Sequence, residues 1–443
     1  MVGQYDQAAK NYQAALEVGG TALSAEQRAR LQRKAAMIHE KRGDYDQALA
    51  GLLAARSTLA ADPAARTSRQ MVRVLSDLGS VHMRKGEYRE AIRLGEQALE
   101  ILDQLDEDRE TLSSEGWVYT NLGVVYTVLG EYHRAEAFYG RGLRAREQAG
   151  DLFGIVLSYN NLGTLARLQG DYERALAAYK RCLEMAQRIG YTYFVAMAYD
   201  NLGICYQGMG RYAEAIAHYR DSLTIREEIG DRAGIASCYN DLGLAYHHLG
   251  EYDRALDYHR RSLEIHEATG HALEVANSLI NIAAVQVDKG DHRQAMASAR
   301  RAVEMLESLG SKVILSEACA VLAQAHLAVG ELDAALRCGE RALRVARETG
   351  SHRDDGVAHR VLGQVCAAQA GREGDVHLVA VSKEHFEQAL ESLRKAGDFF
   401  ELAKGWRGYA QFLADQGAAE EAARCAAEAE RILQVIKGAG EAV

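Results

Sequence analysis

The chain has 443 residues, a formal net charge of −10 and 48% hydrophobic residues, which is enough for a large buried core. Its single proline, Pro63, stands where average usage gives roughly twenty, so the composition indicates helix after helix and excludes collagen, disulfide scaffolds and proline-rich disorder. The acidic balance argues against nucleic-acid and anionic-membrane partners, and no uninterrupted apolar run approaches the ~20 residues that span a bilayer.

The first predicted element is a lone helix over residues 4–18, with Ala8, Tyr12 and Leu16 on its apolar face. It matches the second half of the units that follow, so we predict an orphan half repeat over 1–18. Because its apolar face lacks cover on one side, we expect the ancestral unit to have contained a preceding first helix.

A repeat of 40 residues organises the rest of the chain. Gly-x-Tyr turns recur at this spacing, with weaker copies on both sides, at Gly130, Gly170, Gly210 and Gly250. A Tyr-x-x-Leu-Gly string recurs in the same register, starting at Tyr119, Tyr159, Tyr199 and Tyr239.

Each unit is predicted to be a pair of helices, as residues 151–190 illustrate. Tyr159, Leu162 and Ala166 share one face of the first helix, and Gly170 ends it because glycine tolerates left-handed backbone. Asp171 then begins the second helix, where a carboxylate suits the unpaired N–H groups.

The pairs are predicted to form one continuous solenoid over 1–443. The expected boundaries are 24–60, 65–105, 110–149 and then every 40 residues, so that repeats cover 24–349, followed by 352–396 with an insertion after Gly371, the last pair 399–436, and a disordered tail 437–443. The flanking repeats carry smaller residues, such as Gly95 and Gly339, so we expect the ends to open before the central repeats 110–269.

The string Tyr199-x-x-Leu202-Gly203-x-x-Tyr206, followed by Ala215-x-x-x-Tyr219, resembles the tetratricopeptide repeat. The long period and the missing closing proline resemble the long-helix repeats of Pins/LGN-type adaptors and of bacterial tetratricopeptide signalling proteins. The resemblance implies an all-α, right-handed superhelix, an α-α solenoid of about ten helix pairs plus the half repeat. It also implies that the first helix of each pair lines the concave surface.

A ladder of polar residues accompanies the Leu-Gly pairs, and the resemblance places it in the concave groove. The ladder residues are Asp77, Asn121, Asn160, Asn161, Asp200, Asn201, Asn240, Asp241 and Asn281. Because an amide both donates and accepts, the ladder suits the backbone of an extended peptide. The alternative is that these side chains only tie adjacent first helices together.

Further candidates for the peptide-binding groove lie along the same helices. They are Arg167, Gln207 and His247 beyond the ladder, and Arg73 and Arg84 near its start, where Arg30, Arg33 and Lys34 also suggest a basic end. The adjacent pair His247-His248 cannot bind one metal, because neighbouring helical side chains point about 100° apart, and we expect it to be solvated or groove-lining.

No nucleotide, zinc-protease or serine-hydrolase motif is present, so we expect no enzyme, no metal and no cofactor. The seven cysteines form no Cys-x-x-Cys pair and are expected to be reduced core thiols of a cytoplasmic protein. The predicted function is a non-catalytic, protein- or peptide-binding scaffold in signalling. The alternative is a sensory segment of a larger bacterial protein, such as a signalling ATPase, Ser/Thr kinase or transcription factor. The expected partner is a protein or peptide, with no nucleic acid and no membrane, and the chain is expected to be a monomer or weak homo-oligomer.

Overall fold

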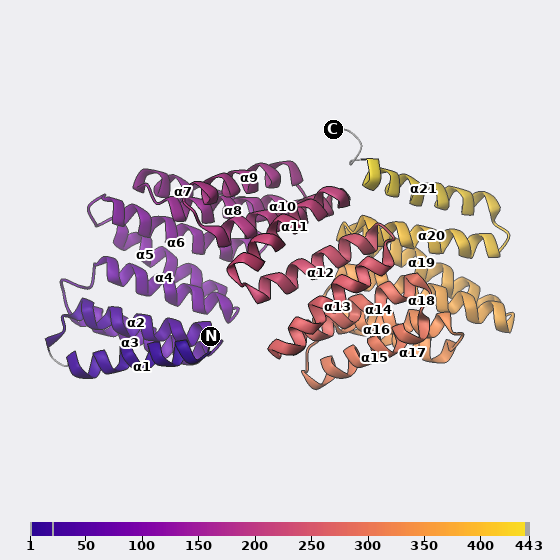
Figure 1. The fold of residues 1–443 in the computed structure, drawn as a ribbon, viewed down its shortest axis with the longest axis horizontal. Coiled ribbons are helices and arrows are strands. Elements are labelled where there is room, and N and C mark those ends of the chain that lie inside the picture. The colour runs from indigo at the N-terminus through magenta and orange to yellow at the C-terminus, as the bar shows by residue number, and fades with distance from the viewer. Residues whose placement is uncertain (1, 20–21, 439–443) are drawn as a thin grey trace. The chain divides into compact units, whose positions relative to one another are not determined.

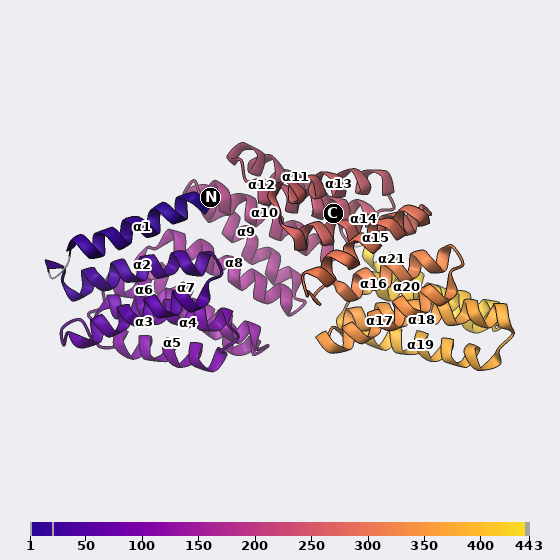
Figure 2. The same ribbon diagram turned by 90° about the horizontal axis from the view of Figure 1, so that it is seen from below.

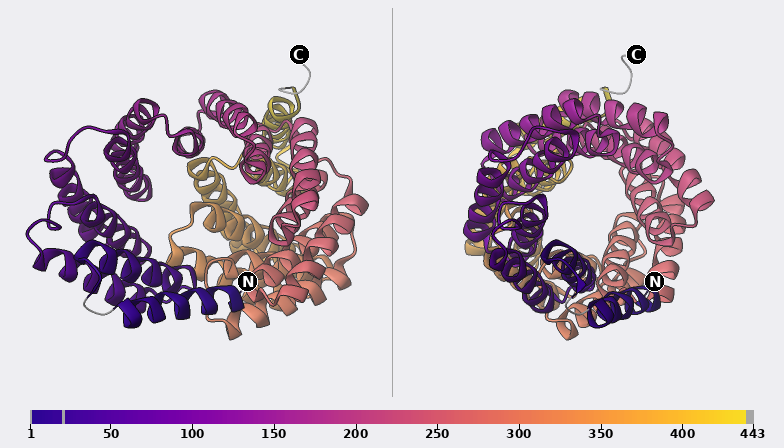
Figure 3. Two further views of the ribbon diagram at one scale, coloured as in Figure 1. Left: turned by 60° about the vertical axis from the view of Figure 1, so that its left-hand side comes forward. Right: turned by 90° about the vertical axis from the view of Figure 1, so that its left-hand side faces the viewer.

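The structure, a computed structural model, describes residues 2–19 and 22–438, and within these every regular element is an α-helix (Figure 1). The views in Figure 3 show the same coiled ribbons joined by short turns. The chain divides into two compact units, Met1–Ala198 (unit 1) and Tyr199–Val443 (unit 2). The predicted tail lies outside the described residues from 439 onward, whereas 437 and 438 still belong to the last helix.

The helices follow the predicted pairing. The first element is α1, Val2–Gly19. The first helices of the pairs are α2 Ala25–Lys41, α4 Arg69–Arg84, α6 Arg109–Val128, α8 Leu152–Leu168, α10 Thr192–Gly208, α12 Arg232–His248, α14 Ala272–Lys289, α16 Leu315–Ala328, α18 His352–Glu373 and α20 Phe399–Asp415. The second helices are α3 Tyr45–Ala61, α5 Tyr88–Leu102, α7 Tyr132–Ala149, α9 Tyr172–Arg188, α11 Tyr212–Ile229, α13 Tyr252–Thr269, α15 His292–Ser308, α17 Leu332–Thr349, α19 Val376–Ala396 and α21 Ala419–Gly438.

The described part of the chain therefore holds ten helix pairs plus one extra helix, which confirms the predicted all-α repeat solenoid. The extra helix, α1, lies alongside α2 (Figure 2). The insertion after Gly371 lengthens the ninth pair instead of forming a loop, because α18 runs on to Glu373 and α19 starts at Val376. A single continuous solenoid over 1–443 stays a prediction.

The turns use the residues that the sequence assigned to them. Gly170 has a φ of +78°, a left-handed conformation that costs a residue with a Cβ roughly 1–2 kcal/mol. The Asp171 side chain accepts a hydrogen bond from the Arg174 backbone N–H at 3.0 Å and so caps α9. The short turn lets the second helix fold back along the first.

An aromatic ring packed on a glycine joins the two helices of the central pairs. Tyr179 of α9 is fully buried, and its ring lies directly over Gly163 of α8, where an added Cβ would come within 2.7 Å of Tyr179 Cε1. The same arrangement recurs at other pairs, formed by Gly123 with Tyr139, Gly203 with Tyr219, Gly243 with His259 and Gly363 with Phe386. The glycine lets the two helices approach closely enough to bury the whole ring.

The cysteines fill the interior as expected. All seven are free thiols, and Cys182, Cys205 and Cys238 are fully buried. Burial raises the pKa of the Cys182 thiol to about 12, so this thiol is protonated and unreactive. No helix in the described part of the chain is both long and apolar enough to cross a membrane.

Replacing Gly163 with Ala should destabilise the protein, because the new methyl group meets the rigid, buried Tyr179 ring. We expect a loss of about 1–3 kcal/mol in the free energy of unfolding, measured by urea denaturation followed by circular dichroism. Gly140→Ala is the matched control, since its new Cβ has no neighbour within 4 Å, and it should gain about 0.5–1 kcal/mol from helix propensity. Equal effects of the two substitutions would contradict the role assigned to the ring-on-glycine contact.

Candidate functional site

Three consecutive first helices of unit 1 line an open cavity of about 500 Å³, which we call the groove cavity. Each of α2, α4 and α6 turns one face toward it. Its lining residues are Arg33, Met37, Glu40, Val72, Arg73, Ser76, Asp77, Ser80, Arg84, Glu110, Ser113, Ser114, Trp117 and Asn121. The cavity therefore brings together the predicted site residues Arg73, Arg84 and Asn121.

The arginines of the groove cavity are ion-paired across neighbouring first helices. Arg33 Nη1 lies 2.6 Å from Asp77 Oδ2, and burial raises the pKa of Asp77 even though Arg33 opposes this shift. Arg73 and Arg84 pair in the same way with Glu110 at 2.7 Å and Glu40 at 2.6 Å. At these positions the expectation of a basic end is wrong, because each positive charge is balanced by a carboxylate.

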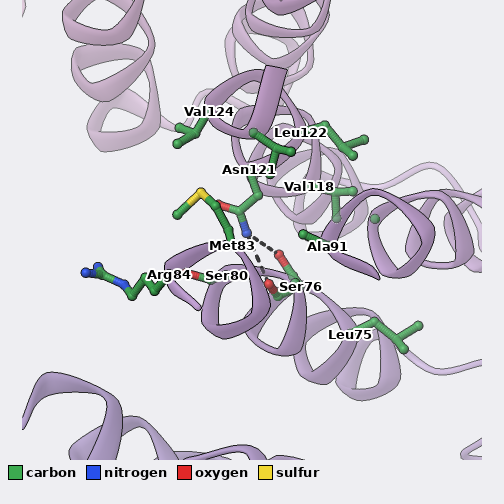
Figure 4. A pocket seen from close by; sticks show the side chains of 13 residues that line it. Leu75, Ser76, Ser80, Met83, Arg84, Ala91, Val118, Asn121, Leu122 and Val124 are labelled. Carbon is green, nitrogen blue, oxygen red and sulfur yellow. Dashed lines mark hydrogen bonds between the residues drawn. The ribbon is translucent and has the colours of Figure 1, made fainter. Parts of the chain in front are cut away.

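The ladder amide of α6 spans the gap to α4. Asn121 Nδ2 donates to the Ser76 backbone oxygen at 3.3 Å and to Ser76 Oγ at 2.8 Å (Figure 4). Its carbonyl oxygen has no donor among the described residues, so it is free to accept one from a ligand. This residue thus ties two helices together and still presents an acceptor to the groove.

The next first helix, α8, carries three more predicted site residues. Among the described residues, the Asn161 side chain has no hydrogen-bond partner, whereas Asn160 is engaged by a neighbour. The Arg167 Nε atom is buried and has no hydrogen-bond acceptor in the described part of the chain. None of these three residues lines the groove cavity.

In unit 2 the ladder becomes acidic and is held by a buried arginine. Arg226 of α11 makes ion pairs with Asp200 and with Asp231, and Cys238 Sγ lies 3.4 Å from Asp200 Oδ1. Burial, reinforced by the negative charge of Asp200, raises the pKa of Asp241 to about 7. The ladder at these positions is a packed ionic cluster.

The other ladder positions of unit 2 also make contacts within the protein. Asn281 Nδ2 donates to Asn240 Oδ1 at 2.8 Å, which ties α14 to α12. Asn201 is engaged by a neighbouring group, and Gln207 Oε1 accepts a hydrogen bond from the Tyr219 hydroxyl at 3.2 Å. Hydrogen bonds thus join adjacent first helices at Asn281 and at Asn121. This is the structural role that was the alternative to peptide binding.

The histidine pair of α12 is covered by the last helix pair of the same unit. His247 is 8% exposed, and its Nε2 lies 2.8 Å from Asp288 Oδ2, which also binds Lys404 of α20 at 2.9 Å. The His248 ring packs 4.1 Å from that of Phe400, and burial lowers its pKa to about 3. Both imidazoles line a cavity of about 340 Å³ together with Phe400 and Lys404, so they are covered rather than freely solvated, and their role in lining a binding groove stays a prediction.

Sequence reasoning missed an aromatic cluster beside the groove cavity. Trp117, which is 41% exposed, packs at 6.5 Å on Phe153, and Phe153 packs at 5.4 Å on Phe194. Tyr191 and Tyr193 extend the cluster and are also exposed. The signal was present as aromatic residues at the starts of α8 and α10 and as Trp117 in the middle of α6, but their mutual contacts depend on how the repeats stack.

A buried arginine packs against the Trp117 ring of this aromatic cluster. Arg146 is fully buried and lies 4.8 Å from the Trp117 ring, and Gly116 and Gly154 leave space for its side chain. Burial lowers its pKa to about 10. Its Nη1 donates to Gly154 O and Ser158 Oγ, at 3.0 and 2.7 Å, which holds the cation under the indole ring.

Sequence models of the tetratricopeptide repeat cover more than half of the chain. One matches residues 70–148, 114–188, 194–268 and 234–308, and a second matches 316–338. The chain belongs to the tetratricopeptide repeat family. A search of curated protein sequences found no match to it.

Solved structures of other tetratricopeptide repeat proteins share the fold at low identity. The apo form of RapI is 15% identical with a TM-score of 0.62, covering 83% of this chain and 99% of RapI. The Rap conjugation gene regulator of plasmid pLS20, solved with the Phr* peptide, is 14% identical with a TM-score of 0.54, covering 85% and 98%. A signal transduction ATPase with a tetratricopeptide repeat sensor from Pyrococcus horikoshii is 15% identical with a TM-score of 0.54, covering 81% and 54%.

The acidic ladder position of this repeat protein should make its stability pH-dependent. Because folding raises the pKa of Asp241 from 3.8 to about 7, the folded state holds this proton more tightly, and stability falls as the pH rises from about 4 through about 7. Asp241→Asn restores the amide found at neighbouring ladder positions and should remove this loss. Relative to the wild type, its free energy of unfolding should be higher at pH 8 than at pH 5 by on the order of 1–2 kcal/mol.

Urea denaturation at pH 5 and pH 8 measures this difference. The control is Asp221→Asn, which changes a carboxylate that is 55% exposed and should leave the pH dependence unaltered. A wild-type and an Asp241→Asn protein with parallel pH profiles would contradict the assignment.

Proposed function

We propose that this chain is a non-catalytic, peptide-binding tetratricopeptide repeat protein that holds an extended segment of a partner protein along the first helices of unit 1. The observation that carries the proposal is the groove cavity, which is open, measures about 500 Å³ and is lined by α2, α4 and α6 alone. A cavity lined by side chains from three successive repeats suits a chain that runs across the repeats.

The polar groups of the groove cavity suit a peptide backbone. Three balanced ion pairs hold the first helices in place without leaving a net charge that would select a strongly charged ligand. The free Asn121 oxygen and the Ser76 and Ser80 hydroxyls can exchange hydrogen bonds with backbone N–H and C=O groups. First helices spaced about 10 Å apart would meet an extended peptide at roughly every third residue.

The aromatic cluster supplies the apolar part of the proposed interface. Exposed Trp and Tyr side chains next to a polar groove are the residues that most often dominate binding energy at protein interfaces. Trp117 borders the groove cavity and is held by Arg146, so a bound segment that leaves the cavity would pass over a rigid indole. A related fold, the pLS20 regulator, has been solved with a peptide, which supports this class of ligand.

The surroundings of the site support a binding role in a reducing compartment. All seven cysteines are thiols outside any disulfide, as expected for the cytoplasm that we propose as its location. In residues 2–19 and 22–438 no group of three His, Cys, Asp or Glu side chains could hold a metal ion. The proposal assigns recognition, and no chemical step, to the groove.

The amide of Asn161 lies on α8, the first helix that follows the groove cavity, and tests whether the bound segment continues across the next repeat, because this side chain has no hydrogen-bond partner among the described residues. Asn161→Ala should weaken binding roughly two- to twelvefold, the effect of one lost hydrogen bond of about 0.5–1.5 kcal/mol. The ligands would be heptapeptides selected on the full chain from a displayed random library, with affinities measured by fluorescence polarisation. Circular dichroism should show unchanged helicity.

Two further variants separate recognition from scaffolding. Asn11→Ala, on the exposed side of α1, should change neither affinity nor stability. Asn121→Ala should lower both, since it also breaks the tie to Ser76. If no peptide is enriched on the chain, or if affinity tracks only the folded fraction in every variant, the proposed function is wrong and the ladder is structural.

A further inference from the structure

A second, smaller cavity lies inside unit 1 between α4, α5 and α6. It measures about 230 Å³, and we call it the interhelix cavity (Figure 4). It is lined mainly by apolar residues, namely Leu75, Gly79, Met83, Ala91, Gly95, Val118, Leu122, Val124 and Val125. An apolar cavity of about 150 Å³ is already large enough to hold a benzene ring, so this one has room for a substituted ring.

The cavity exists because one repeat lacks its packed ring. In the central pairs a tyrosine of the second helix covers a glycine of the first, as Tyr139 covers Gly123. The corresponding positions in the repeat 65–105 are Gly95 and Gly79. This repeat therefore lacks the ring but keeps the glycine on which the ring would pack. A Cβ built on Gly79 makes ordinary contacts with the Ala91 oxygen at 3.4 Å, the Leu94 Cβ at 3.9 Å and the Ala91 Cα at 4.0 Å, and no aromatic ring is among these neighbours.

The neighbouring repeats show where the missing ring would extend. The Tyr139 hydroxyl lies 3.2 Å from Thr127 Oγ1, and the Tyr179 hydroxyl lies 3.0 Å from Thr164 Oγ1. Those threonines correspond to Met83 and Ser80 of the repeat 65–105, and both of these line the interhelix cavity. The space that the missing ring would occupy therefore extends from Gly95 on α5 toward Met83 and Ser80 on α4.

The polar end of the interhelix cavity is shared with the groove cavity. Ser76, Ser80, Arg84 and Asn121 line both. In Figure 4, Asn121 and Ser76 lie between Arg84 on one side and Val118 and Leu122 on the other. A side chain that enters from the groove would thus pass polar residues first and end among apolar ones.

We infer that the interhelix cavity is a specificity subsite that takes the apolar aromatic side chain, a phenylalanine, of the peptide bound in the groove, and this inference rests on the proposed function. The ring of the partner replaces the ring that the repeat 65–105 lacks and sits on Gly79. Because it enters from the groove, its para position ends near Ala91 and Gly95, where the lining side chains are apolar and a tyrosine hydroxyl would give up water without a side-chain hydrogen-bond partner. The subsite therefore prefers phenylalanine to tyrosine.

Toluene, the analogue of the phenylalanine side chain, is the direct probe. Crystals of the full chain soaked with toluene should show the ring over Gly79, and heteronuclear NMR titration should give saturable shifts at Gly79 and Val118. Gly95→Tyr supplies the missing ring from within and should weaken toluene binding by about tenfold or more, since the same space is filled.

A second variant that fills the interhelix cavity keeps the test valid if Gly95→Tyr does not fold. A Cβ at position 95 would lie 2.6 Å from Leu122 Cδ2, so Gly95→Tyr requires Leu122 to move. Gly79→Leu enters the cavity from the other side without a close contact at Cβ and should block toluene equally. Gly140→Tyr, a glycine of the next second helix with open space around it, is the matched control and should bind toluene like the wild type.

The outcomes separate this inference from the proposed function. Toluene that does not bind, or that binds equally to the wild type, Gly95→Tyr and Gly79→Leu, overturns the subsite. Heptapeptides selected on the wild type should carry phenylalanine at one position and lose about tenfold in affinity for Gly79→Leu. Selected peptides without an apolar aromatic residue also overturn the subsite but leave the proposed function standing. Failure to select any peptide contradicts the proposed function, and toluene then decides only whether the cavity takes a ring.

Discussion

The packing of an aromatic ring on a glycine is the contact on which the architecture depends. A helix pair buries little surface unless its two helices approach closely, and a glycine on the first helix permits that approach while a ring on the second fills the space. Tyr179 on Gly163 shows the contact in its full form, with the ring completely buried. Because repeats pack mainly on their neighbours along the chain, each such contact contributes to the local stability of the solenoid.

The same contact explains where unit 1 is open. Where the repeat 65–105 replaces the tyrosine with Gly95, it gives up a buried ring and gains a cavity beside the groove. The pair of α16 and α17 makes the same replacement at Gly339, and at both positions a leucine of the next repeat lies close to a Cβ built on the glycine, Leu122 at 2.6 Å and Leu362 at 2.8 Å. The two pairs differ on the first helix, where α16 carries Ala323 in place of a glycine. Loss of the ring therefore creates a candidate subsite only where the first helix also keeps its glycine and the groove lies next to that glycine.

Charge is arranged differently in the two units. In unit 1 the ion pairs of the groove cavity join side chains on neighbouring first helices at the solvent edge, as in the pair of Arg33 with Asp77. In unit 2 the ladder position Asp200 pairs with the buried Arg226, and Asp288, the partner of His247, binds Lys404 of α20. The polar ladder is regular in sequence, but its members play different roles. They form hydrogen bonds between first helices at Asn281, an ionic cluster at Asp200, and an acceptor that faces the groove at Asn121.

The sequence by itself determined the repeat, the helix pairs and their turns, because these depend on local patterns such as Gly170 followed by Asp171, which act within a few residues. It also marked Gly95 as a departure from the repeat. It could not show that this departure leaves a cavity, that Arg73 and Arg84 are neutralised, or that Trp117 joins Phe153. Each of these depends on which side chains of different repeats face one another, and residues about 40 positions apart meet only after the helices have stacked. The arginines near the start of the ladder suggested a basic end of the groove, and only the tertiary structure decided that each of Arg33, Arg73 and Arg84 faces a carboxylate on a neighbouring first helix.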